Sequence, residues 1–262
     1  MSADLWTWIL NSGILQTLLG IIVGSFIGYW LGLKSGKIQI LRNYIKETVN
    51  KHYPRLYSEI KQRSDELDNF LDKPFEFGYN FPALDDIYNS GLIGFIEKHH
   101  PLLFEKVESF KREVVPGYKK LYNLLRERVT TNIISSWTNY LKEKCNKSDP
   151  YFDLSTINNF VSNLISTVSD YLILPFLFKY AENREDFERD VHSHLNHAFD
   201  REEIPIYGDD RKKVIQELLI RAEPETKNLL EYYQNLIRIN DKITKTELLP
   251  LIKKYIGDPL AK

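Results

Sequence analysis

The chain has 262 residues, and its 35 Lys and Arg nearly balance its 36 Asp and Glu, giving a formal net charge of −1. This balance argues against a globally basic surface, so nucleic acid is not expected as a partner. Cys145 is the single cysteine, which excludes an internal disulfide and agrees with a reducing compartment.

The N-terminal region contains a long run without a charged side chain, from Leu5 to Leu33. A helix needs about 20 apolar residues to cross a bilayer, and residues 14–33 form the most apolar window of that length. Tyr29 and Trp30 lie near its end, where amphipathic rings favour the headgroup boundary. We therefore predict a short extracytoplasmic or interfacial N-terminus at 1–13 and a single transmembrane helix at 14–33.

The flanking charges give the predicted span an orientation. No Lys or Arg precedes it, whereas basic residues outnumber acidic ones from Lys34 to Arg63. The positive-inside bias places the N-terminus outside the cell membrane and the rest of the chain in the cytoplasm. The acidic start and the length of the run favour an uncleaved anchor over a cleaved signal peptide. Four basic residues below the span are expected to contact anionic headgroups: Lys34, Lys37, Arg42 and Lys46.

Glycine recurs at every fourth position through the predicted span. Five small residues share one helix face: Gly13, Thr17, Gly20, Gly24 and Gly28. Such a stripe lets another helix approach closely, and we interpret it as a packing face for a second copy of the chain or for a partner transmembrane helix. Two alternatives remain open, namely the general abundance of glycine in membrane helices and a glycine-lined pore.

Residues 34–73 follow as a basic juxtamembrane segment. Its apolar residues recur every three or four positions, which predicts a long amphipathic helix that Pro54 kinks or divides. Aromatic residues then occupy every second position: Phe75, Phe77, Tyr79 and Phe81. We expect an extended loop here, either packed on the helices or forming a binding surface for a groove ligand or lipid.

The remaining residues, 74–262, are predicted to form a cytoplasmic all-α domain, so the whole chain is an anchored multi-helix bundle. Breaks at Pro, Gly and capping residues separate helices expected at 83–98, 102–115, 118–147, 154–181, 183–199, 211–239 and 247–256. No run alternates in the manner of a strand apart from the aromatic loop, and no fixed-period repeat indicates a solenoid.

Motifs for phosphate binding, for a serine nucleophile and for an HExxH zinc site are absent from the sequence, and no cofactor is expected. One cluster could serve a metal ion. Asp190, His194 and His197 stand at i, i+4 and i+7 on one helix face and could offer a carboxylate and two imidazoles. The alternative is a polar helix face whose histidines titrate in solvent.

These observations favour a non-enzymatic, membrane-tethered interaction or scaffold module. Its anchor would self-associate or pair with another transmembrane helix, and its helical domain would bind a cytoplasmic protein partner. Two other functions stay open. One is an oligomeric, pore-type effector that perturbs the membrane, and the other is a metal-dependent membrane-bound enzyme that uses the Asp190, His194 and His197 cluster.

Overall fold

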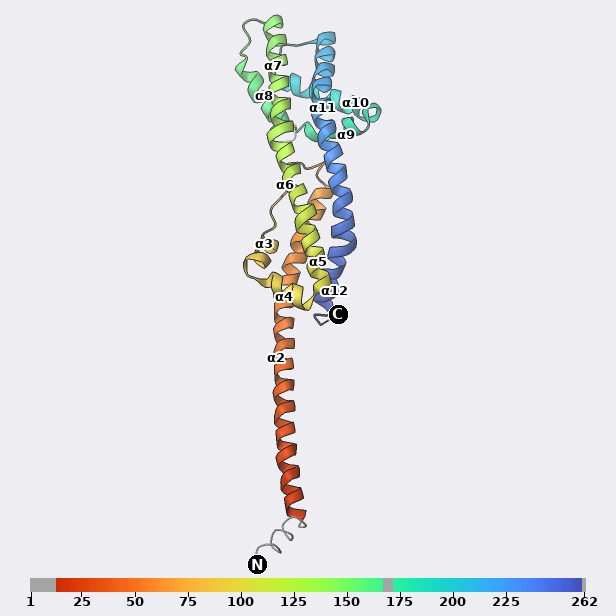
Figure 1. Cartoon of the computed structure of the whole chain (residues 1–262). Helices are drawn as coiled ribbons and strands as arrows, with labels where there is room; N and C mark the ends of the chain where they lie inside the picture. Colours follow the sequence, from red (N-terminus) through yellow and green to blue (C-terminus); the bar gives the residue numbers. More distant parts are fainter. Residues whose placement is uncertain (1–12, 167–171, 261–262) are drawn as a thin grey trace, which may run out of the picture. The chain divides into compact units, whose positions relative to one another are not determined.

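Helices account for the regular structure in the computed structural model, which describes residues 13–166 and 172–260 (Figure 1). No strand occurs in those two ranges, so the all-α prediction is confirmed for them. The predicted N-terminal segment at 1–13 lies outside the described residues except for Gly13. For residues 13–16, 18 and 19 the structure describes the helix but not the side chains.

The chain divides into two compact units. The first unit takes Met1–Pro54 together with Lys254–Lys262, and the second takes Arg55–Lys253. Helix α2 (Gly13–Asp68) begins in the first unit and ends in the second. It contains Pro54, which is exposed. The prediction that Pro54 divides this segment is wrong, because the helix continues through the proline to Asp68.

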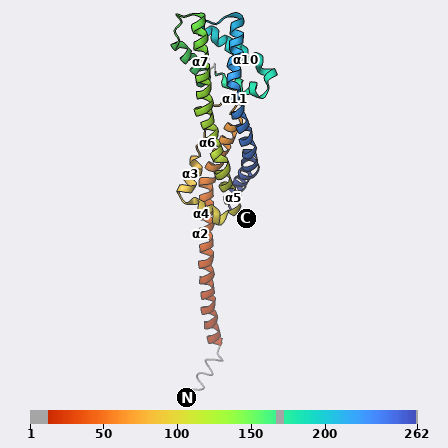
Figure 2. The same cartoon turned by 45° about the horizontal axis from the view of Figure 1, so that its top comes forward.

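The second unit contains a long series of helices after α2. In chain order they are α3 (Pro82–Asn89), α4 (Leu92–His99), α5 (Pro101–Ser109), η1 (Phe110–Val114), α6 (Val115–Asn123), η2 (Leu124–Val129), α7 (Thr130–Ser148), α8 (Ser155–Ser166), α9 (Leu174–Glu182), α10 (Arg184–Arg201), α11 (Gly208–Asn240), η3 (Asp241–Leu248) and α12 (Leu249–Gly257), the last of which ends in the first unit. The η elements are π-helices. Helices α7 and α11 run side by side, with α8 against α7 and both α9 and α10 against α11 (Figures 1 and 2).

Two predicted helix boundaries in the first half of this series are wrong. The helix expected at 83–98 is interrupted because Gly91 adopts φ 74, a left-handed conformation that ends α3 before α4 begins. Conversely, the break expected at Pro116 is absent, and helix runs without interruption from Pro101 to Ser148. The π-helix η1 ends two residues before that proline, which stands at the second position of α6, and its wider turn accommodates a residue that has no N–H to donate.

The later predicted boundaries also need correction. The helix expected at 154–181 is two helices, α8 and α9, and residues 167–171 between them lie outside the described residues. The last helix was expected to begin at Glu247, but α11 passes through η3 directly into α12. Thr244 is fully buried in this run, so its side chain packs inside the unit instead of starting a helix.

The core of the second unit combines large apolar side chains with a small polar network. Trp137 is fully buried, and its Nε1 donates a hydrogen bond of 2.9 Å to the Leu218 carbonyl. The buried Asn240 amide donates to Ser64 Oγ at 2.9 Å and so joins α11 to α2. A buried polar group that has its partner stabilises one particular packing of the helices, because any shift would leave the group unpaired.

Candidate functional site

The most unusual surface of the molecule is the stretch Gly20–Tyr44 of α2, which we call the arm. Every residue of the arm is exposed except Gly36, which is half-exposed. Nine large hydrophobic residues between Ile21 and Leu33 are 48–70% exposed. Ile21, Ile22 and Val23 follow one another at about 100° steps, so apolar side chains face all sides of the helix. A helix that is apolar all round is typical of a buried or membrane environment.

The sequence-predicted packing residues lie along this arm and just before it. A methyl group added at Gly20, Gly24 or Gly28 would meet no atom of another described segment within 4 Å. Thr17 is exposed, and for Gly13 the structure describes the backbone helix alone. No described residue therefore covers the glycine face at these three positions, and the prediction that it packs against another helix stays a prediction.

The arm becomes basic after its apolar part. Lys34, the first charged residue after the apolar stretch, lies over the Trp30 ring, with its Nζ 5.2 Å from the ring centroid. The predicted headgroup contacts, Lys34, Lys37, Arg42 and Lys46, are all exposed. None of the four forms an ion pair with a described acidic residue.

Among the described residues, no helix has a stretch that is long and apolar enough to cross a membrane. The predicted span at 14–33 begins among residues whose side chains are not described. The transmembrane part of the predicted architecture is therefore without support from this finding.

The aromatic loop, Phe75 to Phe81, lies in the second unit, begins with a turn at 74–76 and forms no helix or strand before α3, and its four rings differ in burial. Phe77 and Phe81 are buried, and Phe77 stacks on Tyr118 with ring centroids 5.2 Å apart. Phe75 and Tyr79 are half-buried. Tyr79 contacts Tyr122 with ring centroids 4.4 Å apart, and Arg126 lies over Phe75, so all four rings pack on the helices. Two of the four candidate binding residues, Phe77 and Phe81, are not available at the surface.

One carboxylate of α2 holds the helix that follows this loop. Glu59 accepts hydrogen bonds from the backbone N–H groups of Ala83 and Leu84, at 2.8 and 3.1 Å, and so caps the N-terminus of α3 from another helix. Burial raises the pKa of the Glu59 carboxyl above its ordinary value of 4.5, and the two backbone hydrogen bonds oppose that rise.

Two neighbouring side chains of α2 hold the loop itself. Arg63 Nε donates to the Asn80 carbonyl at 3.0 Å, and Glu66 accepts the Gly78 N–H at 3.0 Å. Arg63 also pairs with Glu66 at 2.6 Å. These contacts are local and satisfied, so they explain the position of the loop and leave no group free for chemistry.

The three residues predicted as metal ligands lie on α10 but do not form a ligand set. Within residues 13–166 and 172–260, no group of three or more His, Cys, Asp or Glu side chains is arranged to hold a metal ion. His194 stacks on Phe176 of α9 with ring centroids 4.7 Å apart, whereas Asp190 and His197 are exposed. Burial, together with the neighbouring His197, lowers the pKa of His194. The arrangement favours the polar-face alternative over the metal site.

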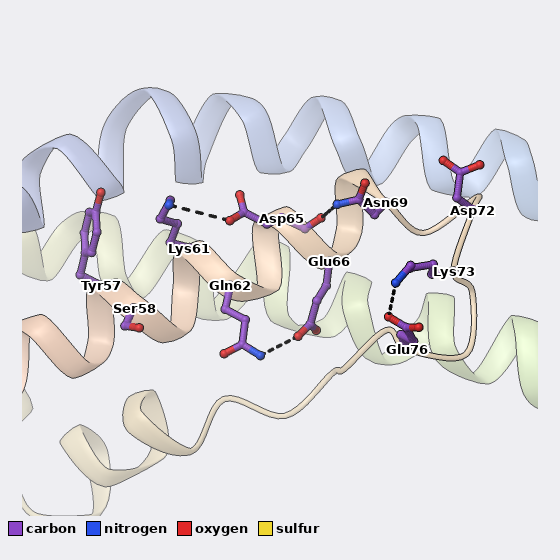
Figure 3. Close-up of a pocket in the computed structure, with 10 residues that line it drawn as sticks. All are labelled: Tyr57, Ser58, Lys61, Gln62, Asp65, Glu66, Asn69, Asp72, Lys73 and Glu76. Carbon is purple, nitrogen blue, oxygen red and sulfur yellow. Dashed lines mark hydrogen bonds and ion pairs between the residues drawn. The ribbon is translucent and has the colours of Figure 1, made fainter. Parts of the chain in front are cut away.

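An open groove of about 780 Å³ runs along α2 between Tyr57 and the loop at Glu76 (Figure 3). Its charged groups are paired, either within the groove or with residues beside it, since Asp72 lies 2.9 Å from Lys179 and Glu66 lies 2.6 Å from Arg63. Lys61 lies 4.0 Å from Asp65, and Lys73 lies 3.1 Å from Glu76. A groove that is already neutralised in this way shows no group directed at a ligand.

The sequence analysis missed Arg126 at the surface. Its guanidinium lies 5.0 Å from the ring centroid of Phe75 and 5.4 Å from that of Tyr122. The spacing of Tyr122 and Arg126, i and i+4 on a helix, is a visible signal for half of this contact. The other half, the contact with Phe75, comes from a loop far away in the sequence.

No protein-family model, no curated protein and no solved structure matches the chain.

Proposed function

We propose that this protein is a membrane-anchored helical interaction module. In this proposal residues 14–33 cross the cell membrane, the N-terminus lies outside, and the second unit lies in the cytoplasm, where it binds a protein partner. The observation that supports it most is the exposure of the arm on all sides. Covering its nine large hydrophobic side chains between Ile21 and Leu33 would contribute about 1 kcal/mol each, on the order of 10 kcal/mol in total.

Lipid fits this surface better than a soluble helical partner. A partner helix in water covers one stripe, whereas the part of the arm before Lys34 has large apolar side chains pointing in all directions. Residues 14–33 would extend about 30 Å as a helix, which equals the thickness of a bilayer core. Lys34 and Lys37 follow at the end where a positive-inside boundary would lie.

The membrane proposal is tested by alkaline carbonate extraction of membranes that contain the full-length chain. The wild type is expected to stay in the pellet. The double variant Ile22→Lys with Phe26→Lys is expected to move to the supernatant, because a Lys near the bilayer centre costs about 2.5–3.5 kcal/mol. The matched control, Leu102→Lys with Ile220→Lys, changes two exposed apolar residues of the second unit and should stay in the pellet. Extraction of the wild type would overturn the proposal.

We further propose that the glycine face mediates self-association or pairing in the membrane, because Gly20, Gly24 and Gly28 leave open space for a neighbouring helix. Crosslinking of the full-length chain in bilayers tests this. Gly24→Ile with Gly28→Ile should weaken association by about tenfold or more, equivalent to about 1.4 kcal/mol. Gly94→Ile, at an open position in α4, is the matched control. Unchanged crosslinking in the arm variant would show that the glycines have no role in assembly.

A further inference from the structure

The two units of the chain differ in net charge. The first unit carries seven Lys and Arg against three Asp and Glu, whereas the second carries 28 against 33. One of the three acidic residues, Asp4, precedes the predicted span, so the part of the first unit that follows the span is basic. The cytoplasmic leaflet of a cell membrane is anionic and attracts basic residues just below a span. The first unit, unlike the second, is therefore complementary in charge to this leaflet.

One line of side chains runs along the basic end of the arm. Its members follow one another at steps of four, three, four and three residues, which keeps them on one face of α2. We call this line, made of Trp30, Lys34, Lys37, Leu41 and Tyr44, the collar stripe. All five residues are exposed, Trp30 at 56%, Leu41 at 45% and Tyr44 at 53%. Ile38 and Ile40 lie on either side of the stripe and are 45% and 71% exposed.

The opposite face of the same turns is polar. It carries Ser35, Gln39, Asn43 and Lys46, which stand about 140–180° around the helix from the collar stripe. The two lysines of the stripe therefore lie on the apolar side, which their long stems can cover while the ammonium groups reach the headgroups. Lys34 Nζ already lies 5.2 Å from the Trp30 ring centroid, so this ring and this charge sit at one depth. Aromatic and basic side chains on one apolar face are typical of a membrane–water interface.

A second copy of the chain fits the collar stripe poorly. Copies that share the predicted span are parallel, so pairing along the stripe would bring Lys34 and Lys37 of the two copies together, and like charges repel. The proposed glycine pairing uses a different face, since Gly24 and Gly28 stand about 120° and 160° around the helix from the stripe. Pairing through those glycines therefore leaves the collar stripe uncovered.

The length of the collar stripe requires a tilted helix if the stripe is to meet the headgroups. Leu41 lies about 12 Å along the axis beyond Leu33, the end of the predicted span, and the headgroup layer is only about 5–7 Å thick on each side. A tilt of about 40°, at the upper end of the range for transmembrane helices, lowers one face by several ångströms. Residues 5–33 form an uncharged run longer than the about 20 residues that an upright span needs, and excess length favours tilting.

We propose that α2 tilts toward the collar stripe as it leaves the membrane, and that the stripe rests on the cytoplasmic leaflet, where Lys34 and Lys37 bind anionic lipid headgroups. This inference rests on the proposed membrane anchor and adds the face of α2 that meets the headgroups. It separates two sets of basic residues that the sequence grouped together, because Lys34 and Lys37 point toward the leaflet and Lys46 points away from it.

Quenching of a dye by lipid tests the proposal in the full-length chain, reconstituted into phosphatidylcholine vesicles with or without phosphatidylserine. An NBD dye is attached to one introduced cysteine, and a nitroxide on the lipid headgroup quenches it on contact. The native Cys145 does not interfere, because it is fully buried and burial raises its pKa to about 11. The dye is placed at Leu41→Cys or at Gln39→Cys, two exposed positions on opposite faces.

We expect stronger quenching at Leu41 than at Gln39, although Leu41 lies about 3 Å farther along the axis from the bilayer core. Depth alone predicts the reverse order, so the comparison reports the face of the helix. Tyr44→Cys and Asn43→Cys, adjacent exposed positions on and off the stripe, repeat it. The excess quenching on the stripe should shrink at high salt and without phosphatidylserine.

Charge variants in the Leu41→Cys background locate the contact. Lys34→Gln with Lys37→Gln should abolish the excess quenching, because each lysine near an anionic leaflet favours contact by about fivefold. Arg42→Gln with Lys46→Gln removes the same charge from residues off the stripe and should retain most of the excess. Circular dichroism verifies that each variant keeps its helix content.

Three outcomes would overturn the proposal. The first is equal or reversed quenching at Leu41 and Gln39, which would show an upright helix. The second is an equal effect of the two charge variants, which would show attraction without a preferred face. The third is a disulfide that joins two copies of Leu41→Cys more readily than two copies of Gln39→Cys, which would assign the collar stripe to a second copy.

The span itself is measured separately, with the dye at Val23→Cys and the nitroxide on the lipid acyl chain. Quenching at Val23 together with equal quenching at Leu41 and Gln39 would reject the collar stripe and keep the anchor. Absence of quenching at Val23 would reject the anchor and the proposal with it.

Discussion

The arm and the second unit use the same kinds of side chain in opposite surroundings. Trp30 of the arm is 56% exposed, whereas Trp137 of the second unit is fully buried and hydrogen-bonded. The helices of the second unit bury one face each, as α7 does with Ile133, Trp137 and Leu141. The arm has no such face, because its apolar residues point in all directions. The second unit therefore supplies its own core, while the large apolar side chains of the arm are left exposed by the described residues.

The largest expected effect comes from the two tryptophans. Trp137→Ala should lower the free energy of unfolding by about 3–5 kcal/mol, because it leaves a cavity and removes a buried hydrogen bond. Trp30→Ala should change it by less than about 0.5 kcal/mol. Urea unfolding of both full-length variants in non-ionic detergent, followed by far-UV circular dichroism, measures the difference. Similar losses for the two variants would contradict the division into a self-sufficient unit and an arm.

The second comparison is between a glycine of the second unit, Gly117, and a glycine of the arm, Gly24. A Cβ at Gly117 would lie 2.4 Å from Leu236 Cδ1, in a buried contact between α6 and α11. Gly117→Ala should therefore cost about 1–3 kcal/mol of unfolding free energy through overpacking. Gly24→Ala meets no atom within 4 Å and should be neutral or stabilising by up to about 1 kcal/mol, since alanine favours helix. Urea midpoints compare the two, and a tolerated Gly117→Ala would show that α6 and α11 adjust easily.

Periodicity and composition predicted the helical class, the long N-terminal helix and a segment without helix at the aromatic residues. They failed at helix ends, for a physical reason that Pro116 illustrates. A proline is a strong local signal for a break, but the π-helix η1 before it accommodates the ring, and packing of Gly117 on Leu236 holds the run together. Gly91 shows the reverse case, in which a left-handed glycine ended a helix that periodicity had continued.

Some features of the molecular surface could be predicted from the sequence, and others could not. The apolar arm and its basic end are contiguous in sequence, so their residues could be named in advance. The position of Arg126 depends on Phe75, which the fold brings to it from a distant loop. The histidines of α10 had a suitable spacing, but His194 packs on Phe176 of another helix, a contact that spacing along α10 cannot reveal. Contacts between side chains of different helices or loops could therefore not be predicted from the sequence alone.

A smaller difference in unfolding free energy is expected between a tyrosine of the second unit, Tyr118, and a tyrosine of the arm, Tyr29. The Tyr118 hydroxyl is buried and donates to the Arg63 carbonyl at 3.1 Å, and it lies 3.4 Å from Asn240 Oδ1. Tyr118→Phe should cost about 1 kcal/mol of unfolding free energy, the usual net value of one buried hydrogen bond. Tyr29→Phe, at a site that is 68% exposed, should leave the unfolding free energy unchanged. Equal urea midpoints for the two variants would show that this polar network adds nothing to stability.

The smallest expected effect is a pH dependence that comes from Glu59 of the second unit. Burial raises the pKa of Glu59 above its ordinary value of 4.5, so the folded chain binds this proton more tightly than the unfolded chain does. As pH rises from below 4.5 through the raised pKa, the unfolded carboxyl ionises first, and the stability contributed by Glu59 is lost. Glu59→Gln cannot titrate. The unfolding free energy of the wild type, relative to that of Glu59→Gln, should therefore decrease across this window. An increase would mean that the hydrogen bonds from Ala83 and Leu84 outweigh burial and lower the pKa of Glu59 instead.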